Sequence, residues 1–181
     1  MSGHNKWSKI KHKKAATDAK KSKLFSVLVK TIALESKEAS GDKNHPKLKA
    51  VIDRAKAVNM PNENIDRAVL KGASKDSANL ESVIYEAYGP HGVAIIAEGI
   101  TDNRNRTTAE IKHLLSKNGG NLAVPGSTLW AFSKKDDGWQ ANDLIPLKTK
   151  DKPAVEKIIT ALIDHDDIDN IYTNSELSQI E

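Results

Sequence analysis

The chain contains no cysteine and few aromatic residues, and each shortage excludes a class of function. Without cysteine there is no disulfide, no thiolate nucleophile and no cysteine-ligated zinc site. Aromatic residues make up 4% of the 181 residues, which disfavours a protein that binds single strands on an aromatic face. No apolar run reaches the roughly 18 residues of a membrane span, and the amino terminus lacks the apolar stretch of a secretory signal. We therefore expect a cytoplasmic protein.

Acidic residues are nearly absent from the first thirty positions, where Asp18 is the single acid among nine lysines. The formal charge of this segment is +8, whereas the whole chain sums to +4, so the remainder is mildly acidic at −4. Such an asymmetry indicates a polyanionic partner. Lysines at this density repel one another, so we expect the tail to stay mobile until phosphates neutralise it. The lysines are Lys6, Lys9, Lys11, Lys13, Lys14, Lys20, Lys21, Lys23 and Lys30.

A solvated charged face is the alternative interpretation of this lysine-rich segment, because runs of charge often serve only solubility. Trp7 makes that alternative less attractive, since an aromatic ring among lysines has no obvious core to join. The ring is suited to stacking on a base or docking in a groove, and it is equally suited to fixing the tail to the helical domain.

The first part of the chain has the apolar spacing of three helices. Leu24, Leu28 and Ile32 recur every four residues within a helix expected from Ala15 to about Ser40. Prolines at positions 46 and 61 suit the first turns of two further helices, and Gly72 stands where a left-handed carboxyl cap is expected. We predict a basic tail and three-helix domain over 1–72, followed by a polar linker over 73–80.

The pattern then changes to short β-prone runs that alternate with helical spacing. Strands are predicted over 83–88, 93–100, 127–133 and 168–173, with helices around 109–115 and from Pro153 to Ile163. The order predicts an α+β fold over 81–181, in which helices cover one face of a largely antiparallel sheet.

A second candidate for anion binding is Thr101-Asp-Asn-Arg-Asn-Arg-Thr107, between a predicted strand and the start of a helix. Such a junction presents free backbone amides, and Arg104 and Arg106 add two guanidinium groups suited to phosphate or carboxylate. The alternative is structural: Asp102 or Asn103 caps the helix while the arginines make internal hydrogen bonds.

Other segments carry weaker signals. Tyr85 and Tyr88 are expected to share one face of their strand, where packing is favoured over a surface contact. The run Asp164-His-Asp-Asp167 invites a metal-site interpretation, but its spacing matches no known ligand pattern, and an acidic turn before a strand usually faces solvent. Glycine-rich phosphate loops are absent, and we nominate no catalytic residue and no metal site.

Taken together, several motifs resemble the YebC/PmpR family. The similarity runs from Ser2 to about Phe132 and resumes around Asp166 to Asn174. Its carriers are Gly3-His-Asn-Lys-Trp7 with His12 and Lys14, Asn59-Met-Pro61 with Asn64-Ile-Asp-Arg-Ala68, Tyr85-Glu86 with Tyr88-Gly-Pro90, Thr101 to Thr107, and Gly119-Gly-Asn-Leu122.

That resemblance implies a helical first domain followed by α+β domains, a cytoplasmic location, and neither catalytic activity nor a cofactor. Members are described as DNA-binding transcriptional regulators, while mitochondrial relatives act as translational activators and some bacterial members are linked to relief of ribosome stalling. The nucleic-acid contacts implied for this chain are Lys6, Trp7, Lys9, Lys11, His12, Lys14, Lys20 and Lys23, with Arg104 and Arg106 as a secondary patch. Lys13 and Lys21 of the same lysine-rich segment are further candidate contacts.

The sequence departs from the family pattern in two places. Ala87 and His91 stand where the family tends to have glycine. Members usually carry a third domain inserted into the second, whereas here only the segment 133–150 separates a predicted strand from the helix at Pro153. We therefore expect a short member that lacks the inserted domain.

Our interpretation is a non-enzymatic, nucleic-acid-binding regulator of gene expression, with no membrane or small-molecule partner. Binding to duplex DNA and binding to ribosomal RNA both remain open, because no recognition helix or dimeric spacing can be identified in the sequence. An adaptor whose tail binds an acidic protein is a third possibility.

Overall fold

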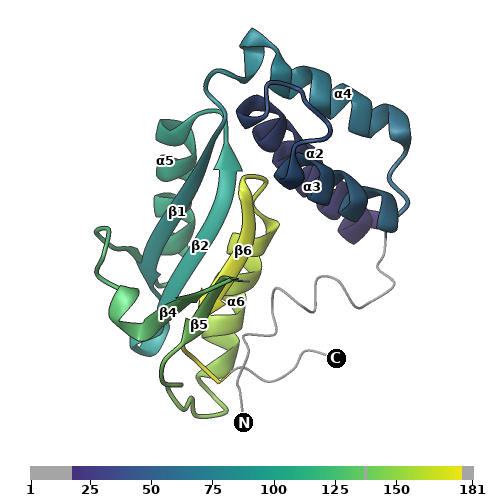
Figure 1. Cartoon of the computed structure of the whole chain (residues 1–181). Coiled ribbons are helices and arrows are strands. Elements are labelled where there is room, and N and C mark those ends of the chain that lie inside the picture. The colour runs from purple at the N-terminus through teal and green to yellow at the C-terminus, as the bar shows by residue number, and fades with distance from the viewer. Residues whose placement is uncertain (1–17, 137, 177–181) are drawn as a thin grey trace. The chain divides into compact units, whose positions relative to one another are not determined.

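The computed structural model describes residues 18–136 and 138–176, which form two compact units (Figure 1). The helical unit comprises the described residues up to Ser82 together with Ile100–Arg104, and the α+β unit comprises Val83–Gly99 and the described residues from Asn105 onward. Within the described residues, no helix is both long enough and apolar enough to cross a bilayer. The limits of the domains stay a prediction.

Three helices build the helical unit, as the apolar spacing predicts: α2 (Asp18–Glu38), α3 (Pro46–Ala57) and α4 (Asn62–Ala73). Pro46 occupies the first turn of α3, where its missing N–H costs nothing. The connections need left-handed residues, namely Ser40 and Gly41 after α2 and Asn59 between α3 and α4. The helices enclose a core that contains Leu28, Ile32, Leu48, Val51, Ile52, Ala55, Met60, Ile65, Ala68 and Val69.

The prediction that Gly72 forms a left-handed cap is wrong. Gly72 lies buried inside α4, and a Cβ placed on it would stand 2.2 Å from the carbonyl oxygen of Ala33 in α2. The Ser36 hydroxyl donates a 2.7 Å hydrogen bond to the carbonyl of Val69 at the same crossing. Glycine is therefore needed here because two helix backbones meet, and not because of its φ angle.

The segment 73–80 continues from α4 into a short 3₁₀ helix, η1 (Lys75–Ser77). The Ser77 hydroxyl donates to the carbonyl of Gly72, and the Lys37 ammonium donates to the carbonyls of Ala78 and Leu80. Leu80 is buried in a small cluster with Ala33 and Ile100. These contacts place the segment within the helical unit.

The α+β unit is built on a four-stranded sheet with the order β3-β1-β2-β6. Its strands are β1 (Glu81–Tyr88), β2 (Ala94–Thr101), β3 (Asn121–Leu122) and β6 (Ile168–Thr173). Strand β3 pairs antiparallel with β1, and β6 pairs antiparallel with β2. A tight turn with the 3₁₀ helix η2 (Pro90–Gly92) joins β1 to β2. The predicted α+β class with a largely antiparallel sheet is confirmed.

Two helices, α5 (Arg104–Lys117) and α6 (Lys152–Asp164), contribute the helical side of the main core. Ile111 and Leu115 of α5 and Ile158 and Leu162 of α6 are fully or almost fully buried there. The sheet and Val93, which lies just before β2, contribute the rest: Val83, Tyr85, Ala87, Val93, Ile95, Ala97, Ile168 and Ile171. One face of the sheet is thus covered by helices, as predicted.

The expectation that Tyr85 and Tyr88 share a face is wrong, because residues an odd number of positions apart lie on opposite faces of a strand. Tyr85 belongs to the helix-covered core, whereas Tyr88 packs with the cluster on the other side. A two-stranded sheet supplies that second cluster: β4 (Phe132–Lys135) pairs antiparallel with β5 (Gly138–Ala141).

The strand predicted over 127–133 is wrong at 127–131 and correct only at Phe132 and Ser133. Residues Ser127 and Thr128 form a turn, and Leu129–Ala131 form the 3₁₀ helix η3 before β4 begins at Phe132. The backbone amide of Thr128 donates to the buried carboxylate of Glu86 instead of to a strand, because a buried carboxylate must be hydrogen-bonded. Strand β3 at Asn121–Leu122, which the apolar pattern does not show, pairs with β1 instead.

Candidate nucleic-acid interface

Most of the predicted tail contacts lie outside the described residues: Lys6, Trp7, Lys9, Lys11, His12, Lys13 and Lys14. Lys20, Lys21 and Lys23 lie in the first turns of α2. The Lys21 ammonium stands 5.5 Å from the centroid of the Phe25 ring, and Lys21 is exposed. The tail lysines therefore lead into a helix whose later turns are anchored in a hydrophobic core.

Helix α3 adds a second group of cations to the helical unit. Lys49, Arg54 and Lys56 are exposed, and their side chains make no hydrogen bond or ion pair with any residue that the structure describes. Lys47 is partly engaged by Glu38, at 3.5 Å. Asp53 is the single acid of this helix, so its exposed surface carries a net positive charge. Cations without carboxylate partners are available to phosphates.

Helix α4 carries no net charge, because its two acids are balanced by the exposed Arg67 and Lys71, although it follows α3 through a short turn and so occupies the place of a recognition helix. Its exposed acids are Glu63 and Asp66. Glu63 is paired with Arg67 at 2.7 Å, and Asp66 with Lys43 at 2.7 Å. A helix without net positive charge, and with the carboxylate of Glu63 in its first turn, gains little from phosphates, so it is poorly suited to entering a DNA groove.

The two arginines of the Thr101–Thr107 segment both contact carboxylates. Arg104 pairs with Glu81 at 3.1 Å within the helical unit. Arg106 pairs with Asp167 at 2.7 Å within the α+β unit, and its Nε lies 3.9 Å from Glu110. The structural alternative raised by the sequence is therefore supported by specific partners, while the role of both arginines in anion binding stays a prediction.

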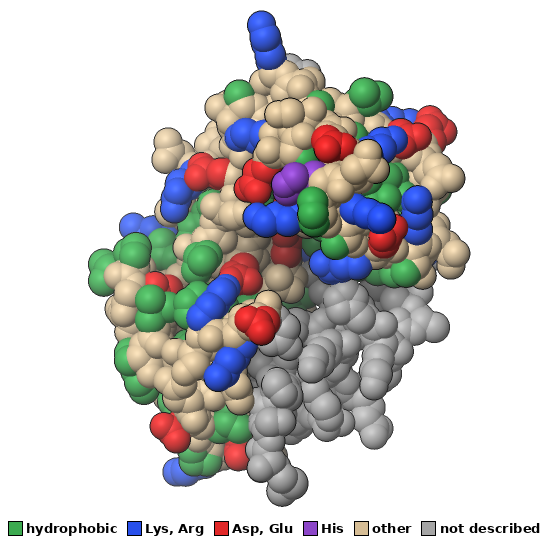
Figure 2. Space-filling view, in the orientation of Figure 1, with side chains coloured by type: hydrophobic (Ala, Val, Ile, Leu, Met, Phe, Trp, Pro, Cys, Tyr) green, Lys and Arg blue, Asp and Glu red, His purple; other side chains and the backbone are tan. Residues whose placement is uncertain are grey.

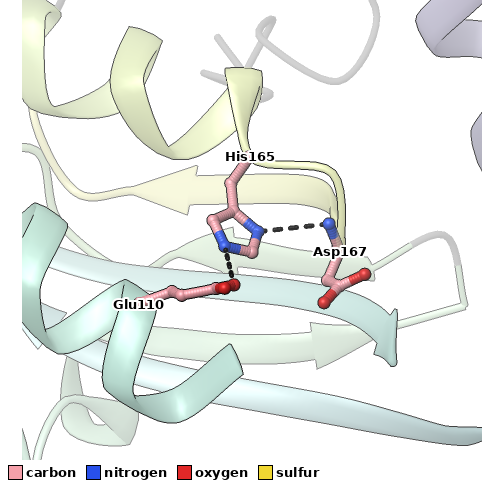
Figure 3. A group of neighbouring side chains, drawn as sticks. All are labelled: Glu110, His165 and Asp167. Atoms are coloured by element: carbon pink, nitrogen blue, oxygen red, sulfur yellow. Dashed lines mark hydrogen bonds and ion pairs between the residues drawn. The ribbon is translucent and has the colours of Figure 1, made fainter. Parts of the chain in front are cut away.

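Asp167 is the acceptor of the Arg106 contact, and the expectation that its acidic turn faces solvent is wrong at this position. Figure 3 shows His165 between Glu110 and the backbone nitrogen of Asp167. The Asp167 side chain is 5% exposed, and hydrogen bonds from Arg106 and from the buried Thr107 hydroxyl, both at 2.7 Å, offset the cost of burying the carboxylate. Its backbone N–H donates to Nδ1 of His165, whose Nε2 lies 3.0 Å from Glu110. The turn thus joins α5, the end of α6 and the start of β6.

Glu110, His165 and Asp167 bring one ligand atom each to within 4.8 Å of one another, but the group does not suit a metal ion. Nδ1 of His165 already accepts a backbone hydrogen bond, which leaves Nε2 to carry the proton toward Glu110. The Arg106 guanidinium occupies the Asp167 carboxylate. A cation would have to displace both contacts, so the cluster is a structural network.

Glu86 fixes the loop between β3 and β4. Its buried carboxylate accepts hydrogen bonds from the backbone N–H of Gly126 at 2.5 Å and from the N–H and hydroxyl of Thr128 at 2.7 and 2.8 Å. Burial raises the pKa of Glu86, but these three hydrogen bonds prevail and lower the pKa below its ordinary value. Glu86 is therefore ionised at neutral pH and holds the loop.

Trp130 is displayed at the end of this loop, with 64% of its surface exposed. Its Nε1 donates to the Tyr88 hydroxyl at 3.1 Å, and that hydroxyl donates to the carbonyl of Ser127 at 2.6 Å. Val124 and Leu129 of the same loop are also exposed. Figure 2 shows hydrophobic side chains on the surface of the α+β unit where Figure 1 draws the segment that leads into β4.

Sequence reasoning missed Trp130, because a predicted strand over 127–133 made it an ordinary strand residue. The available signal was composition: a tryptophan within thirteen consecutive uncharged residues, Asn121 to Ser133, in a chain that is 29% charged.

Replacing Glu86 by glutamine is expected to destabilise the α+β unit by about 1–2 kcal/mol at pH 7, because an amide accepts fewer of these hydrogen bonds. Since the pKa is lowered on folding, the Glu86 contribution is present above the unfolded value and is lost as pH falls through the folded one. The difference between wild type and variant should shrink as the pH falls below the ordinary glutamate pKa of 4.5. Urea unfolding at several pH values measures it.

The exposed Glu176 supplies the control for this experiment. Glu176→Gln should leave stability within about 0.5 kcal/mol at every pH, because surface changes of this kind have small effects. A Glu86→Gln penalty that stays constant from neutral to acidic pH would contradict the role given to the carboxylate.

Comparison with known proteins adds the family. Residues 5–75 match the model of the TACO1/YebC protein N-terminal domain, and residues 80–137 match the model of the TACO1/YebC second and third domain. The chain belongs to the TACO1/YebC family. The match to the second model ends between β4 and β5, and the helix and strand that follow complete the α+β unit.

Curated TACO1/YebC relatives match the same region. A "Probable transcriptional regulatory protein" of Thermosipho africanus is 50% identical over 137 residues, which are 75% of this chain and 54% of that protein. The relative from Thermoanaerobacter pseudethanolicus is 54% identical over 136 residues, covering 74% of this chain and 55% of the relative. This chain thus spans about half the length of the curated relatives it matches.

A solved structure shares the fold. The crystal structure of a conserved hypothetical protein, Aq1575, from Aquifex aeolicus superimposes with a TM-score of 0.85 and 28% sequence identity. The superposition covers 96% of this chain and 97% of that one.

Proposed function

We propose that this chain is a non-enzymatic regulator of gene expression that binds the phosphates of nucleic acid through its amino-terminal lysines. The observation that carries the proposal is the concentration of charge, +8 in the first thirty residues of a chain whose remainder sums to −4. The release of condensed counterions by such a segment drives association with a polyanion. The names of the curated relatives, probable transcriptional regulatory proteins, favour DNA as the partner.

Ribosomal RNA is the second candidate, and the surface of α4 favours it. In a DNA-reading helix pair the second helix enters the major groove, but Glu63 and Asp66 place carboxylates on the first turns of α4. The net positive charge lies on α3 instead, where Lys49, Arg54 and Lys56 are exposed, whereas Arg67 and Lys71 of α4 only balance its acids. A cationic tail with additional phosphate contacts on α3 needs no groove-reading helix and is suited to the irregular surface of folded RNA.

Replacing Lys9, Lys11, Lys13 and Lys14 by glutamine is expected to weaken binding to all nucleic-acid sequences alike, because phosphate contacts carry no sequence information. If about six tail lysines contact phosphates, the slope of log affinity against log salt concentration is roughly −5. The slope of the variant should be smaller in magnitude by about 3 to 4, because four of these contacts are removed. Fluorescence anisotropy at several salt concentrations measures the slope.

The matched control removes four exposed lysines of the α+β unit: Lys112, Lys117, Lys148 and Lys157 are replaced by glutamine. This variant has the same net charge as the tail variant and should keep most of the wild-type slope. Equal slopes for the two variants would show that net charge, and not the tail, determines binding.

Sedimentation of cell lysate with and without nucleases separates the two partners. A transcriptional regulator should follow DNA and be released by DNase. Association with ribosomes that survives DNase and is lost in the tail variant would overturn the transcription role in favour of RNA. Free migration in every condition would favour the alternative of an adaptor for an acidic protein.

A further inference from the structure

Trp130 presents a largely exposed indole ring that a hydrogen bond holds in place, and we propose that it stacks on an unpaired base of the bound nucleic acid. The proposal rests on the proposed function, since it assumes a nucleic-acid partner. It adds a contact in the α+β unit to the phosphate contacts proposed for the lysine-rich tail. It also requires a partner that has unpaired bases.

The ring is held in place before any partner arrives. Its Nε1 is bonded to the Tyr88 hydroxyl, and its backbone carbonyl accepts a 2.9 Å hydrogen bond from the Asn142 side chain. Glu86 and Tyr88 fix the preceding residues from Gly126 to Thr128. A side chain ordered in this way loses little conformational entropy on binding, so a stacked contact keeps most of its free energy.

The hydrogen bond to Tyr88 also determines which part of the indole is available. The single polar atom of the ring is occupied, so the exposed part of the ring offers a partner apolar carbon surface. Trp139 shows the contrast: its Nε1 donates to Glu98 at 2.8 Å, and the Lys134 ammonium lies 4.5 Å from its ring centroid. No cation or ring contact of this kind covers Trp130 among the described residues.

The surroundings of Trp130 fit a base. The segment from Asn121 to Ser133 has no charged residue, so the contact is not ionic. The exposed Asn121 is paired with Tyr88 in the β3–β1 register and therefore lies on the same face of the sheet, where its amide offers both a donor and an acceptor. An aromatic platform near a free amide is the chemistry that recognises unpaired bases, while the lysine-rich tail takes the phosphates.

Two probes of equal length test the proposal: a single-stranded oligothymidylate and the same deoxyribose-phosphate chain without bases. Trp130→Ala is expected to bind the oligothymidylate about 5- to 150-fold more weakly than wild type, the range for loss of one stacked base. Its affinity for the abasic chain should be unchanged. Trp130→Phe, which keeps a smaller aromatic ring, should lose less affinity for the oligothymidylate than Trp130→Ala.

Leu70→Ala is the control for loss of exposed apolar surface, because Leu70 is 71% exposed on α4, and it should change neither affinity. Protection of the Gly126 and Thr128 amides from hydrogen exchange shows that the loop is intact in each variant. Full affinity of Trp130→Ala for the oligothymidylate would overturn the stacking contact and leave the tail-based function standing. An equal loss on the abasic chain would also overturn it. Failure of the wild type to bind any nucleic acid would overturn the proposed function and the stacking contact together.

Discussion

Replacing Gly99 by alanine is expected to destabilise the α+β unit by more than about 3 kcal/mol. Gly99 lies where the pairing of β2 with β6 shifts register, opposite Ile168. A Cβ on Gly99 would stand 1.7 Å from the carbonyl oxygen of Asp167 and 2.8 Å from its carbonyl carbon. Because both atoms belong to the backbone, no side-chain rotation relieves the overlap, and the two strands must separate.

Urea unfolding followed by far-UV circular dichroism measures this loss, and hydrogen exchange of the β2 and β6 amides shows whether it is local. Gly92→Ala is the control, because Gly92 has a left-handed φ of +75° but open space around it. Gly92→Ala should destabilise the unit only by the energy of placing alanine in a left-handed conformation, about 1–2 kcal/mol. A Gly99→Ala variant no less stable than Gly92→Ala would contradict the steric account.

Replacing Asp167 by alanine is expected to destabilise the same unit by about 3 kcal/mol. Loss of one partner of a buried ion pair costs about 3–5 kcal/mol, and the lower end applies because the Arg106 side chain is 45% exposed and can be hydrated. The Thr107 hydroxyl is fully buried and loses its acceptor, which adds to the cost. Urea unfolding of the variant provides the measurement.

Asp164 belongs to the same acidic run but is exposed, so Asp164→Ala is the matched control and should stay within about 0.5 kcal/mol of wild type. The stability of Asp167→Asn should lie between those of Asp167→Ala and Asp164→Ala, because an amide oxygen still accepts one of the hydrogen bonds. Equal stabilities of the two alanine variants would contradict the role of Asp167 as the centre of the network.

Local patterns of the sequence predicted much of the fold. The starts of α3 and α6 follow from prolines that fit a first helical turn, and β6 was predicted over the same residues that form it. The charge asymmetry is a property of composition and needs no structure. These features depend on neighbours along the chain, which a sequence displays directly.

Contacts between residues far apart in the sequence could not be predicted from these local patterns. The sequence by itself determined the helical and β periods, the cationic start and the family resemblance. The tertiary structure decided that Gly72 and Gly99 are required by close backbone approaches, that Asp167 is buried against Arg106, and that Glu86 captures the loop which displays Trp130. The physical reason is that burial and hydrogen bonding of a residue depend on partners dozens of positions away, and periodicity carries no information about them.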